Sequence, residues 1–363
     1  MDLSAAFDLV SPELLLQKMK MYGFQDDLIN WISSYLTDRF QSVWIDHVFS
    51  SFLHNSIGVP QGSNLGPLFF LIFFNDLPTY ITEKVDCYAD DSTMSATASS
   101  IEEIGVILSD DCNRLSDWMA GNSFKLNAGK THLMTVGTKE RLKTLQSDLT
   151  VAMDGVILKE DPDKCEFLLG VKIQADLKWS EQIDYLAGKL KKRLAGLNRL
   201  RFVMNISTRK NIVQGVFNSV LCYCLPLFGG YAKTEVKSLQ VLQNQAAQIV
   251  LKLPPRSNRE KMFGELTWLT VQQLIAYHTL LAVYRVRQSK EPEYLAEILC
   301  RDNKTGNIVM ENTTLCLYRS SFIFRGSVMW NKMPNMLKKE NKIGKFKLGM
   351  KKWVLENIPR FLD

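Results

Sequence analysis

The stretch Val85-Asp86-Cys87-Tyr88-Ala89-Asp90-Asp91-Ser92 places two adjacent carboxylates directly after a short apolar half-strand. A polar half-strand, 93–97, follows, so the pattern predicts a β-hairpin with both acids at its turn. Neighbouring side chains of a strand point to opposite faces, and a turn is what presents two adjacent acids at one sheet edge. Asp is also a common turn residue, and taken alone the pair is more typical of a solvated turn.

Composition limits the classes of protein to consider. The chain has 363 residues, of which 46% are hydrophobic and 23% charged, which is typical of a globular chain with two or three domains. The net charge is +6, but residues 301–363 hold thirteen Lys or Arg against five Asp or Glu, so this segment carries +8 and the rest −2. A basic C-terminal segment indicates a polyanionic partner or, almost as often, a solvated tail.

Cysteine and histidine positions indicate neither a disulfide framework nor a zinc site. The seven cysteines are scattered and odd in number, which suits reduced thiols in an intracellular compartment. No signal peptide is visible. The uncharged stretch 211–232 contains Gln214, Asn218 and Pro226, so we favour a buried helix ending at Pro226 over a membrane span, and we expect no membrane association.

The first half of the chain mixes helices with hairpins. Ser11 and Pro12 predict the start of a helix that Gly23 ends, and a second helix is expected at about 26–36. Ser100-x-x-Glu103 predicts a capping box at the start of a long helix. Strands are expected at 40–49 paired with 51–57, at 133–136, at 150–153 paired with 156–158 across Asp154-Gly155, and at 165–173 with Gly170 at its centre.

Helical patterns dominate after Trp179. They predict helices at 180–203, 207–225, 234–252 and 270–288. We therefore place a domain boundary near 175–180 and expect three parts: a first domain at 1–177, a helical domain at 178–300 and a basic C-terminal region at 301–363.

Acids at two places suggest a metal site. Asp2 stands at the start of a short alternating stretch, far along the chain from the adjacent pair Asp90 and Asp91. Acids from separate strands meet only where the strands are neighbours in a sheet, so we expect an antiparallel sheet backed by helices, which is an α+β fold. Converging carboxylates suit Mg²⁺, and two such ions about 3.5–4 Å apart are the arrangement for in-line phosphoryl transfer.

Five motifs then occur in the order and spacing of one known family. They resemble motifs A to E of reverse transcriptases, in wording most similar to those of non-LTR (LINE-type, jockey-like) retrotransposons. The ending, with Phe322-x-x-Arg325-Gly326, Met329-Trp330 and Phe346-Lys347, is similar to the C-terminal region of those proteins. The five motifs read Asp2-Leu-Ser-Ala-Ala-Phe-Asp8-Leu-Val, Gly58-Val-Pro-Gln-Gly-Ser-Asn-Leu-Gly-Pro67 with Phe74-Asn-Asp-Leu-Pro78, Tyr88-Ala-Asp-Asp91, Leu126-Asn-Ala-Gly-Lys130-Thr131 and Phe167-Leu-Leu-Gly170-Val.

The resemblance implies roles for the acids and the lysine. Asp2, Asp90 and Asp91 would be catalytic and would hold two Mg²⁺ (or Mn²⁺) ions. Lys130 would lie near the phosphates as a charge or proton donor, although a surface lysine beside a glycine turn fits its position almost as well.

The resemblance also implies which residues bind the nucleotide. Phe7 would exclude a ribose 2′-hydroxyl, with a plain core phenylalanine as the alternative. Gln61 would meet the incoming nucleotide, and Gly58 and Gly62 would let backbone approach it, with a Pro/Gly turn before a helix as the alternative for this loop. Asp8 could cap the helix from Pro12 or lie in the site, and we favour a structural role for it. We expect Asp76 to be a turn or helix-end acid.

Nucleic acid is the partner that the resemblance implies. An RNA template, a DNA primer and dNTPs would bind, with Gly170 in the primer-grip hairpin and Lys191, Lys192 and Arg193 of a helical thumb contacting phosphates. A solvated helix face is the equal alternative for these basic residues. Trp330, Phe322 and Phe324 could stack on bases, but we favour core positions.

The resemblance begins only at motif A. The fingers that precede this motif in the family are not in the sequence, so we expect a fragment cut at its 5′ side whose activity alone is uncertain. The alternative is a non-catalytic nucleic-acid-binding remnant of such an element, and a third possibility is a chain with no retained function. The sequence gives no localisation signal, but the family implies an intracellular protein that works on chromosomal DNA in the nucleus at some stage.

Overall fold

The first helix begins at the residues that the local sequence signals predict. The Ser11 hydroxyl accepts a hydrogen bond from the amide of Leu14, and Pro12 occupies the first turn, where its missing N–H costs nothing. Helix α1 (Pro12–Met21) therefore starts as predicted, and α2 (Asp26–Leu36) follows after Gly23.

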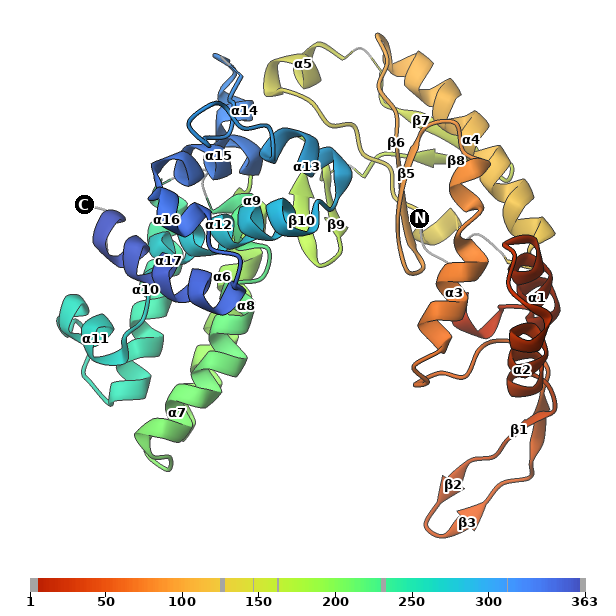
Figure 1. Ribbon diagram of the computed structural model, residues 1–363, viewed down its shortest axis with the longest axis horizontal. Coiled ribbons are helices and arrows are strands. Elements are labelled where there is room, and N and C mark those ends of the chain that lie inside the picture. The colour runs from red at the N-terminus through yellow and green to blue at the C-terminus, as the bar shows by residue number, and fades with distance from the viewer. Residues whose placement is uncertain are drawn as a thin grey trace. The chain divides into compact units, whose positions relative to one another are not determined.

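The computed structural model describes residues 6–124, 128–145, 147–161, 163–229, 233–311 and 313–359. The chain forms two compact units, 1–166 and 167–363, whose elements are labelled in Figure 1. The unit boundary lies within the hairpin at 165–174, whose second strand packs against the helix that begins at Ser180. Among the helices of the described residues, none is long and apolar enough to cross a membrane.

Helices and short hairpins alternate in the first unit. Strands β5 (Lys84–Tyr88) and β6 (Asp91–Ser95) form one hairpin, and β7 (Thr150–Met153) and β8 (Val156–Lys159) form another. The other elements of this unit are η1 (Ala6–Asp8), β1 (Arg39–Gln41), β2 (Trp44–Ile45), β3 (Val48–Phe49), β4 (Leu53–Asn55), α3 (Gly66–Phe74), η2 (Leu77–Thr79), α4 (Ile101–Gly121), η3 (Ala128–Lys130) and α5 (Lys139–Thr144).

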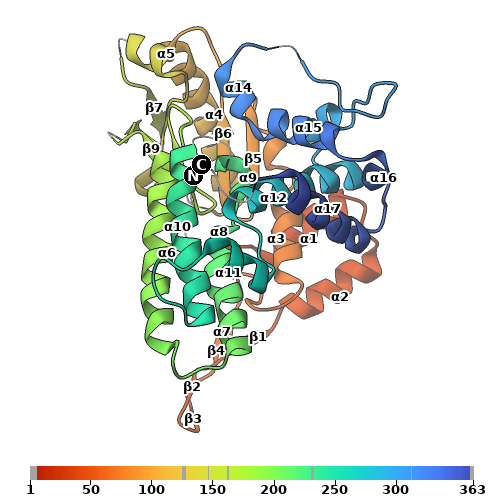
Figure 2. The same cartoon turned by 90° about the vertical axis from the view of Figure 1, so that its left-hand side faces the viewer.

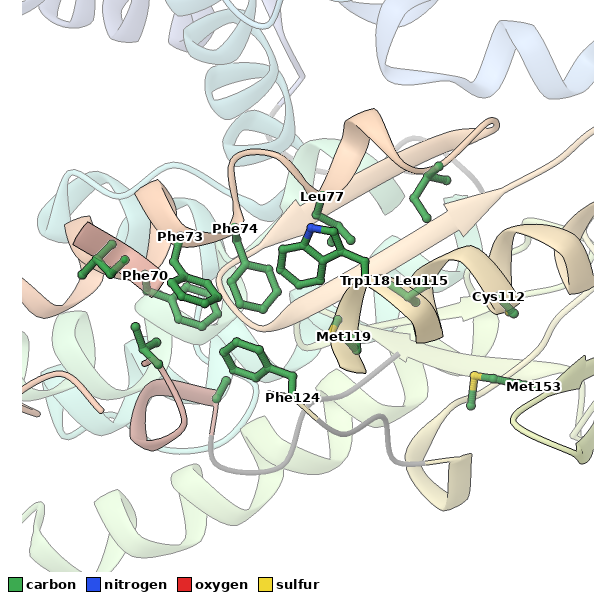
Figure 3. Packing of buried hydrophobic residues seen from close by; sticks show 14 of the residues in the cluster. Phe70, Phe73, Phe74, Leu77, Cys112, Leu115, Trp118, Met119, Phe124 and Met153 are labelled. Atoms are coloured by element: carbon green, nitrogen blue, oxygen red, sulfur yellow. The ribbon is translucent and has the colours of Figure 1, made fainter. Parts of the chain in front are cut away.

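A cluster of aromatic rings forms the core between α3 and α4. The rings of Phe74 and Trp118 lie 5.0 Å apart between centroids, and Phe124 lies 5.2 Å from Phe74 (Figure 3). All three side chains are buried, as are Phe70 and Phe73. Burial of large apolar side chains contributes about 1.5–3 kcal/mol each, so this cluster is the main force that holds α3 against α4.

The strands of the described residues pair only as five two-stranded antiparallel sheets. The mixture of helices and antiparallel strands agrees with the predicted α+β class, whereas one continuous central sheet is not formed by these residues. The stretch around Asp2, which the sequence assigned to that sheet, lies outside the described residues.

Three strand predictions in the first half need correction. The hairpin of 40–57 turns at Asp46 and His47, both with positive φ, so β1 pairs with β4 and β2 with β3, and the turn expected at Ser50 is wrong. Residues 133–136 form no strand, because the amide of Thr135 donates to a side chain, the carboxylate of Glu160, instead of a neighbouring strand. The strand expected at 165–173 is a hairpin.

Helices make up most of the second unit. Hairpin β9 (Cys165–Leu168) and β10 (Val171–Gln174) leads into α6 (Ser180–Leu200). The region predicted as one helix at 207–225 is broken by a π-helical stretch, and the chain turns at Cys224, where φ is positive, so Pro226 starts a helix and does not end one. This region comprises α7 (Ile206–Val213), η4 (Gln214–Asn218), α8 (Ser219–Leu221) and α9 (Leu225–Phe228).

The C-terminal motif packs the end of the chain onto the helical unit. Arg325 donates a 2.6 Å hydrogen bond to the carbonyl of Pro226, and burial lowers its pKa to about 10. Gly326 lies where a Cβ would approach Val283 to 2.7 Å, and Trp330 is buried, as predicted. The helices here are α10 (Lys233–Leu251), α11 (Arg259–Leu266), α12 (Val271–Ser289), α13 (Glu293–Leu299), α14 (Cys316–Ser320), α15 (Phe322–Lys332), α16 (Asn335–Lys338) and α17 (Ile343–Asn357).

Candidate active site

The predicted hairpin forms and turns at the paired acids, although of the two only Asp90 lies in the turn and Asp91 begins β6. Tyr88 pairs with Asp91 across the last rung of β5 and β6, so only Ala89 and Asp90 form the turn. Ala89 has a φ of 53°, a left-handed conformation that a non-glycine residue adopts at a cost of about 1–2 kcal/mol. The Asp90 side chain is half-buried and that of Asp91 is exposed. The two carboxylates are thus held on a tight turn and remain accessible to a ligand.

A buried acid holds the base of this hairpin. Asp111 of α4 is 1% exposed, and its two carboxylate oxygens accept hydrogen bonds of 2.9 Å from the Thr82 amide and 2.8 Å from the Glu83 amide. Both amides lie just before β5. Because one carboxylate fixes two successive backbone groups, α4 determines where the hairpin leaves the core.

Sequence reasoning missed Asp111. The signal available was an acid beside Cys112 on the apolar side of a helix, where an unpaired charge would be costly. Its hydrogen-bond partners are backbone amides, which carry no sequence signature, and Arg114 Nε lies 4.0 Å from its Oδ1.

The loop predicted to meet the nucleotide docks on the segment that follows Asp2. The amide of Gly58 donates to the carbonyl of Val10 at 2.8 Å, and the amide of Val59 donates to the carbonyl of Phe7 at 3.0 Å. Gly58 has a φ of 77°, and a Cβ on it would lie 2.8 Å from the Cα of Asp8. Only glycine permits this approach, so the first two motif segments meet in space although about fifty residues separate them.

Asp8 and Gln61 join these segments through their side chains. Gln61 Nε2 donates to Asp8 Oδ1 at 2.7 Å, and both side chains are exposed. The helix cap predicted for Asp8 is instead provided by Ser11. Gly62 has a φ of 78° with no atom within 4 Å of a built Cβ, so space beside it is open.

The Phe7 ring stacks on a core ring. It lies 4.6 Å from the Phe70 ring between centroids, with 25° between the planes, and the side chain is half-buried. One face of Phe7 is therefore fixed by α3, which is the support that a steric filter requires and equally what a core phenylalanine would show.

Asp2 and Lys130 are the other residues predicted for the active site. Asp2 lies outside the described residues, so its distance from Asp90 is not defined. Lys130 ends η3 and is exposed. In the part of the chain that the structure describes, no group of three or more His, Cys, Asp or Glu side chains is arranged to hold a metal ion. The predicted ligand set is thus represented there by Asp90 and Asp91 alone.

Asp76 forms an ion pair beneath this region. Lys18 Nζ lies 2.8 Å from Asp76 Oδ1, donates to the carbonyl of Phe73 at 2.8 Å and lies 4.6 Å from the Trp118 ring centroid. Burial lowers the pKa of Lys18, and Asp76 partly offsets this. The acid expected at a helix end therefore also ties α1 to the end of α3.

The predicted nucleic-acid contacts lie on the second unit. Gly170 has a φ of 77° at the β9–β10 turn, and the Tyr223 hydroxyl donates to the neighbouring carbonyl of Leu169 at 2.6 Å. Lys191 and Lys192 are exposed on α6. Arg193 donates to the carbonyl of Val216, so it binds within the unit and is not a free cation on the helix surface.

Comparison with known proteins agrees with these features. A family model described as reverse transcriptase (RNA-dependent DNA polymerase) matches residues 1–190, more than half of the chain. The chain belongs to this reverse transcriptase family.

The curated relatives come from mobile elements. The chain is 26% identical over 300 residues to the probable RNA-directed DNA polymerase from transposon BS of Drosophila melanogaster, covering 79% of this chain and 32% of that protein. It is 25% identical over 265 residues to the RNA-directed DNA polymerase from mobile element jockey of the same species, covering 70% of this chain and 28% of the relative. These matches support the jockey-like, non-LTR assignment, and the chain spans about a third of the length of these relatives.

Proposed function

We propose that this chain is the core of an RNA-directed DNA polymerase of a non-LTR retrotransposon, in which residues 1–166 supply the palm and the helices from α6 onward supply a thumb. The observation that carries the proposal is the docking of loop 58–61 on residues 7–10, which joins two motif segments of the family. The turn with Asp90 and Asp91 adds accessible acids on a separate hairpin.

The donor set suits a divalent cation. Asp90 and Asp91 present carboxylate oxygens, which are the ligands that Mg²⁺ or Mn²⁺ prefers, and Asp2 would be the third ligand by resemblance. Two bound ions would activate the primer 3′-hydroxyl and neutralise the leaving pyrophosphate. The protein's own contribution would be to hold the hairpin through Asp111 and to orient the nucleotide through Gln61.

RNA template, DNA primer and dNTPs are the substrates that this function requires. Lys191 and Lys192 of α6 are exposed and would contact template–primer phosphates, with affinity that falls as salt rises. Work on chromosomal DNA would place the protein in the nucleus at some stage. A nucleic-acid-binding protein without catalysis is the second candidate, because the exposed lysines of α6 do not depend on the acidic turn.

Primer extension on an RNA template with dNTPs and Mg²⁺ tests the proposal. Extension should occur, and Asp90→Asn should abolish it, because an amide cannot replace a charged ligand. Asp86→Asn is the matched control, since Asp86 lies on the same hairpin, is exposed and pairs with Lys84 at the surface.

Three outcomes separate the candidates. Equal activity of Asp90→Asn and the native chain would refute the catalytic assignment. Salt-dependent binding of template–primer without extension would favour the second candidate. Extension that appears only when an upstream segment is supplied would show that catalysis needs residues beyond this chain.

A further inference from the structure

The corner between α6 and α7 combines exposed apolar side chains with a high local positive charge. Residues 199–210, which form this corner, contain no Asp or Glu but four Lys or Arg. Within this stretch the connection from α6 to α7 exposes four apolar side chains in seven residues: Leu200, Phe202, Val203 and Ile206. Exposed apolar groups in a strongly basic setting indicate a binding surface and not a solvated helix face.

A buried arginine ties this corner to the end of α10. Arg209 of α7 is 5% exposed, and its Nε donates to the carbonyl of Val250 at 2.7 Å. Its Nη1 donates to the carbonyls of Arg201, at 3.3 Å, and of Met204. The arginine thereby satisfies backbone carbonyl groups near the C-terminal ends of α6 and α10. Figure 2 shows α6, α7 and α10 side by side in the helical unit.

Two cations flank the exposed phenylalanine. The Phe202 side chain is 68% exposed, and the Arg201 guanidinium lies 4.4 Å from its ring centroid. Lys252 Nζ lies 6.0 Å from the same centroid and 3.5 Å from the Phe202 carbonyl oxygen. A ring that is 68% exposed offers area to a second planar group, and the two cations supply charge for a phosphate beside it.

We propose that this corner binds single-stranded nucleic acid, with an unpaired base stacked on Phe202 and the adjacent phosphates held by Arg201 and Lys252. The inference rests on the proposed function and adds to it a contact separate from Lys191 and Lys192. Base stacking on an exposed aromatic is insensitive to sequence, so the corner would hold any template or displaced strand. An acidic protein would meet the same charge but has no base to cover the ring face.

Fluorescence anisotropy of a labelled oligo(dT) strand, with no nucleotide or metal added, tests this inference on the full chain. Phe202→Ala should weaken binding about tenfold, within the range that loss of one stacked base produces, whereas Phe202→Trp should retain it. Lys252→Ala should weaken binding and lower the slope of log affinity against log salt by about one. Leu348→Ala and Lys345→Ala are the matched controls, because both remove exposed side chains of α17 that lie far along the chain from Phe202.

Several results would overturn the inference. These are no binding by the native chain, an equal loss in Leu348→Ala or Lys345→Ala, and an equal effect of Phe202→Ala on a blunt duplex, which offers no unpaired base. Competition by anionic lipid vesicles at the same site would assign the corner to a membrane surface instead. Binding is measured without catalysis, so failure of primer extension leaves this test intact, and loss of the corner leaves the extension result intact.

Discussion

Gln61 and Asp8 are joined by a 2.7 Å hydrogen bond from Nε2 to Oδ1, across 53 positions of sequence. The bond fixes the side-chain amide of Gln61, so its Oε1 faces away from Asp8. A residue proposed to meet the incoming nucleotide is thereby oriented before the nucleotide arrives, which lowers the entropy cost of binding.

Loss of this bond should be visible in nucleotide affinity. We expect Asp8→Ala to raise the KM for dNTP about fivefold with a smaller change in kcat, since one hydrogen bond at an exposed site contributes about 1 kcal/mol. Asp8→Asn should behave like the native chain, because its Oδ1 accepts the same bond. Steady-state primer extension measures both constants, and equal defects in the two variants would argue against an orienting role.

Asp111 should control the stability of the acidic hairpin. Asp111→Ala leaves the amides of Thr82 and Glu83 without their acceptor. We expect the free energy of unfolding to fall by about 2–4 kcal/mol. Asp111→Asn keeps one acceptor oxygen and should lower the free energy of unfolding by about half as much.

Hydrogen exchange localises the effect of Asp111. Amides from Thr82 to Ser95 should exchange faster in the alanine variant, while those of α1 should not change. Uniform acceleration throughout the first unit would show that Asp111 stabilises the core as a whole and not the hairpin in particular.

Local signals predicted much of this architecture. The Ser11 cap, the Asp154-Gly155 turn and the acidic hairpin each depend on residues close in sequence, so propensity and pattern were sufficient. The turn at Asp46 and His47 was misplaced because Ser50-Ser51 also suits a turn, and alternation is similar on either side of both.

The contacts that build the candidate site were beyond sequence reasoning. Asp8 with Gln61, Asp111 with the Thr82 amide, and Lys18 with Asp76 are separated by 53, 29 and 58 positions. Each depends on how helices and loops pack, and in two of them a backbone group or an exposed amide is the partner. The predicted convergence of Asp2 with Asp90 remains a prediction, because Asp2 lies outside the described residues.

Single substitutions in the Lys18–Asp76 pair should lower the free energy of unfolding strongly, and the double substitution should lower it only weakly. The two side chains are only 12% and 27% exposed. Asp76→Ala leaves a buried cation without its partner, so we expect the free energy of unfolding to fall by about 3 kcal/mol. Lys18→Met with Asp76→Asn removes both charges and should cost much less. Urea unfolding followed by tryptophan fluorescence measures this, since Trp118 lies against Lys18; additive losses would show that the charges are not coupled.

The same pair predicts a pH dependence. Burial lowers the pKa of Lys18 in the folded chain below 10.5, so over the range between the lowered pKa and 10.5 the unfolded chain binds more protons. The contribution of Lys18 to stability therefore rises with pH in that range. Lys18→Met should abolish this rise, and an unchanged pH profile of the unfolding free energy in this variant would exclude Lys18 as its source.

Gly58 and Gly62 provide a matched test of the loop's docking. Both have positive φ, 77° and 78°, so alanine at either position costs about 1–2 kcal/mol of backbone strain. A Cβ at Gly58 would also lie 2.8 Å from the Asp8 backbone, whereas one at Gly62 meets no atom within 4 Å. Gly58→Ala should therefore separate the loop from residues 7–10 and lower the unfolding free energy well beyond the loss in Gly62→Ala. Urea unfolding of both variants gives the difference, and equal losses would mean that strain alone, and not the close approach to Asp8, makes glycine necessary at position 58.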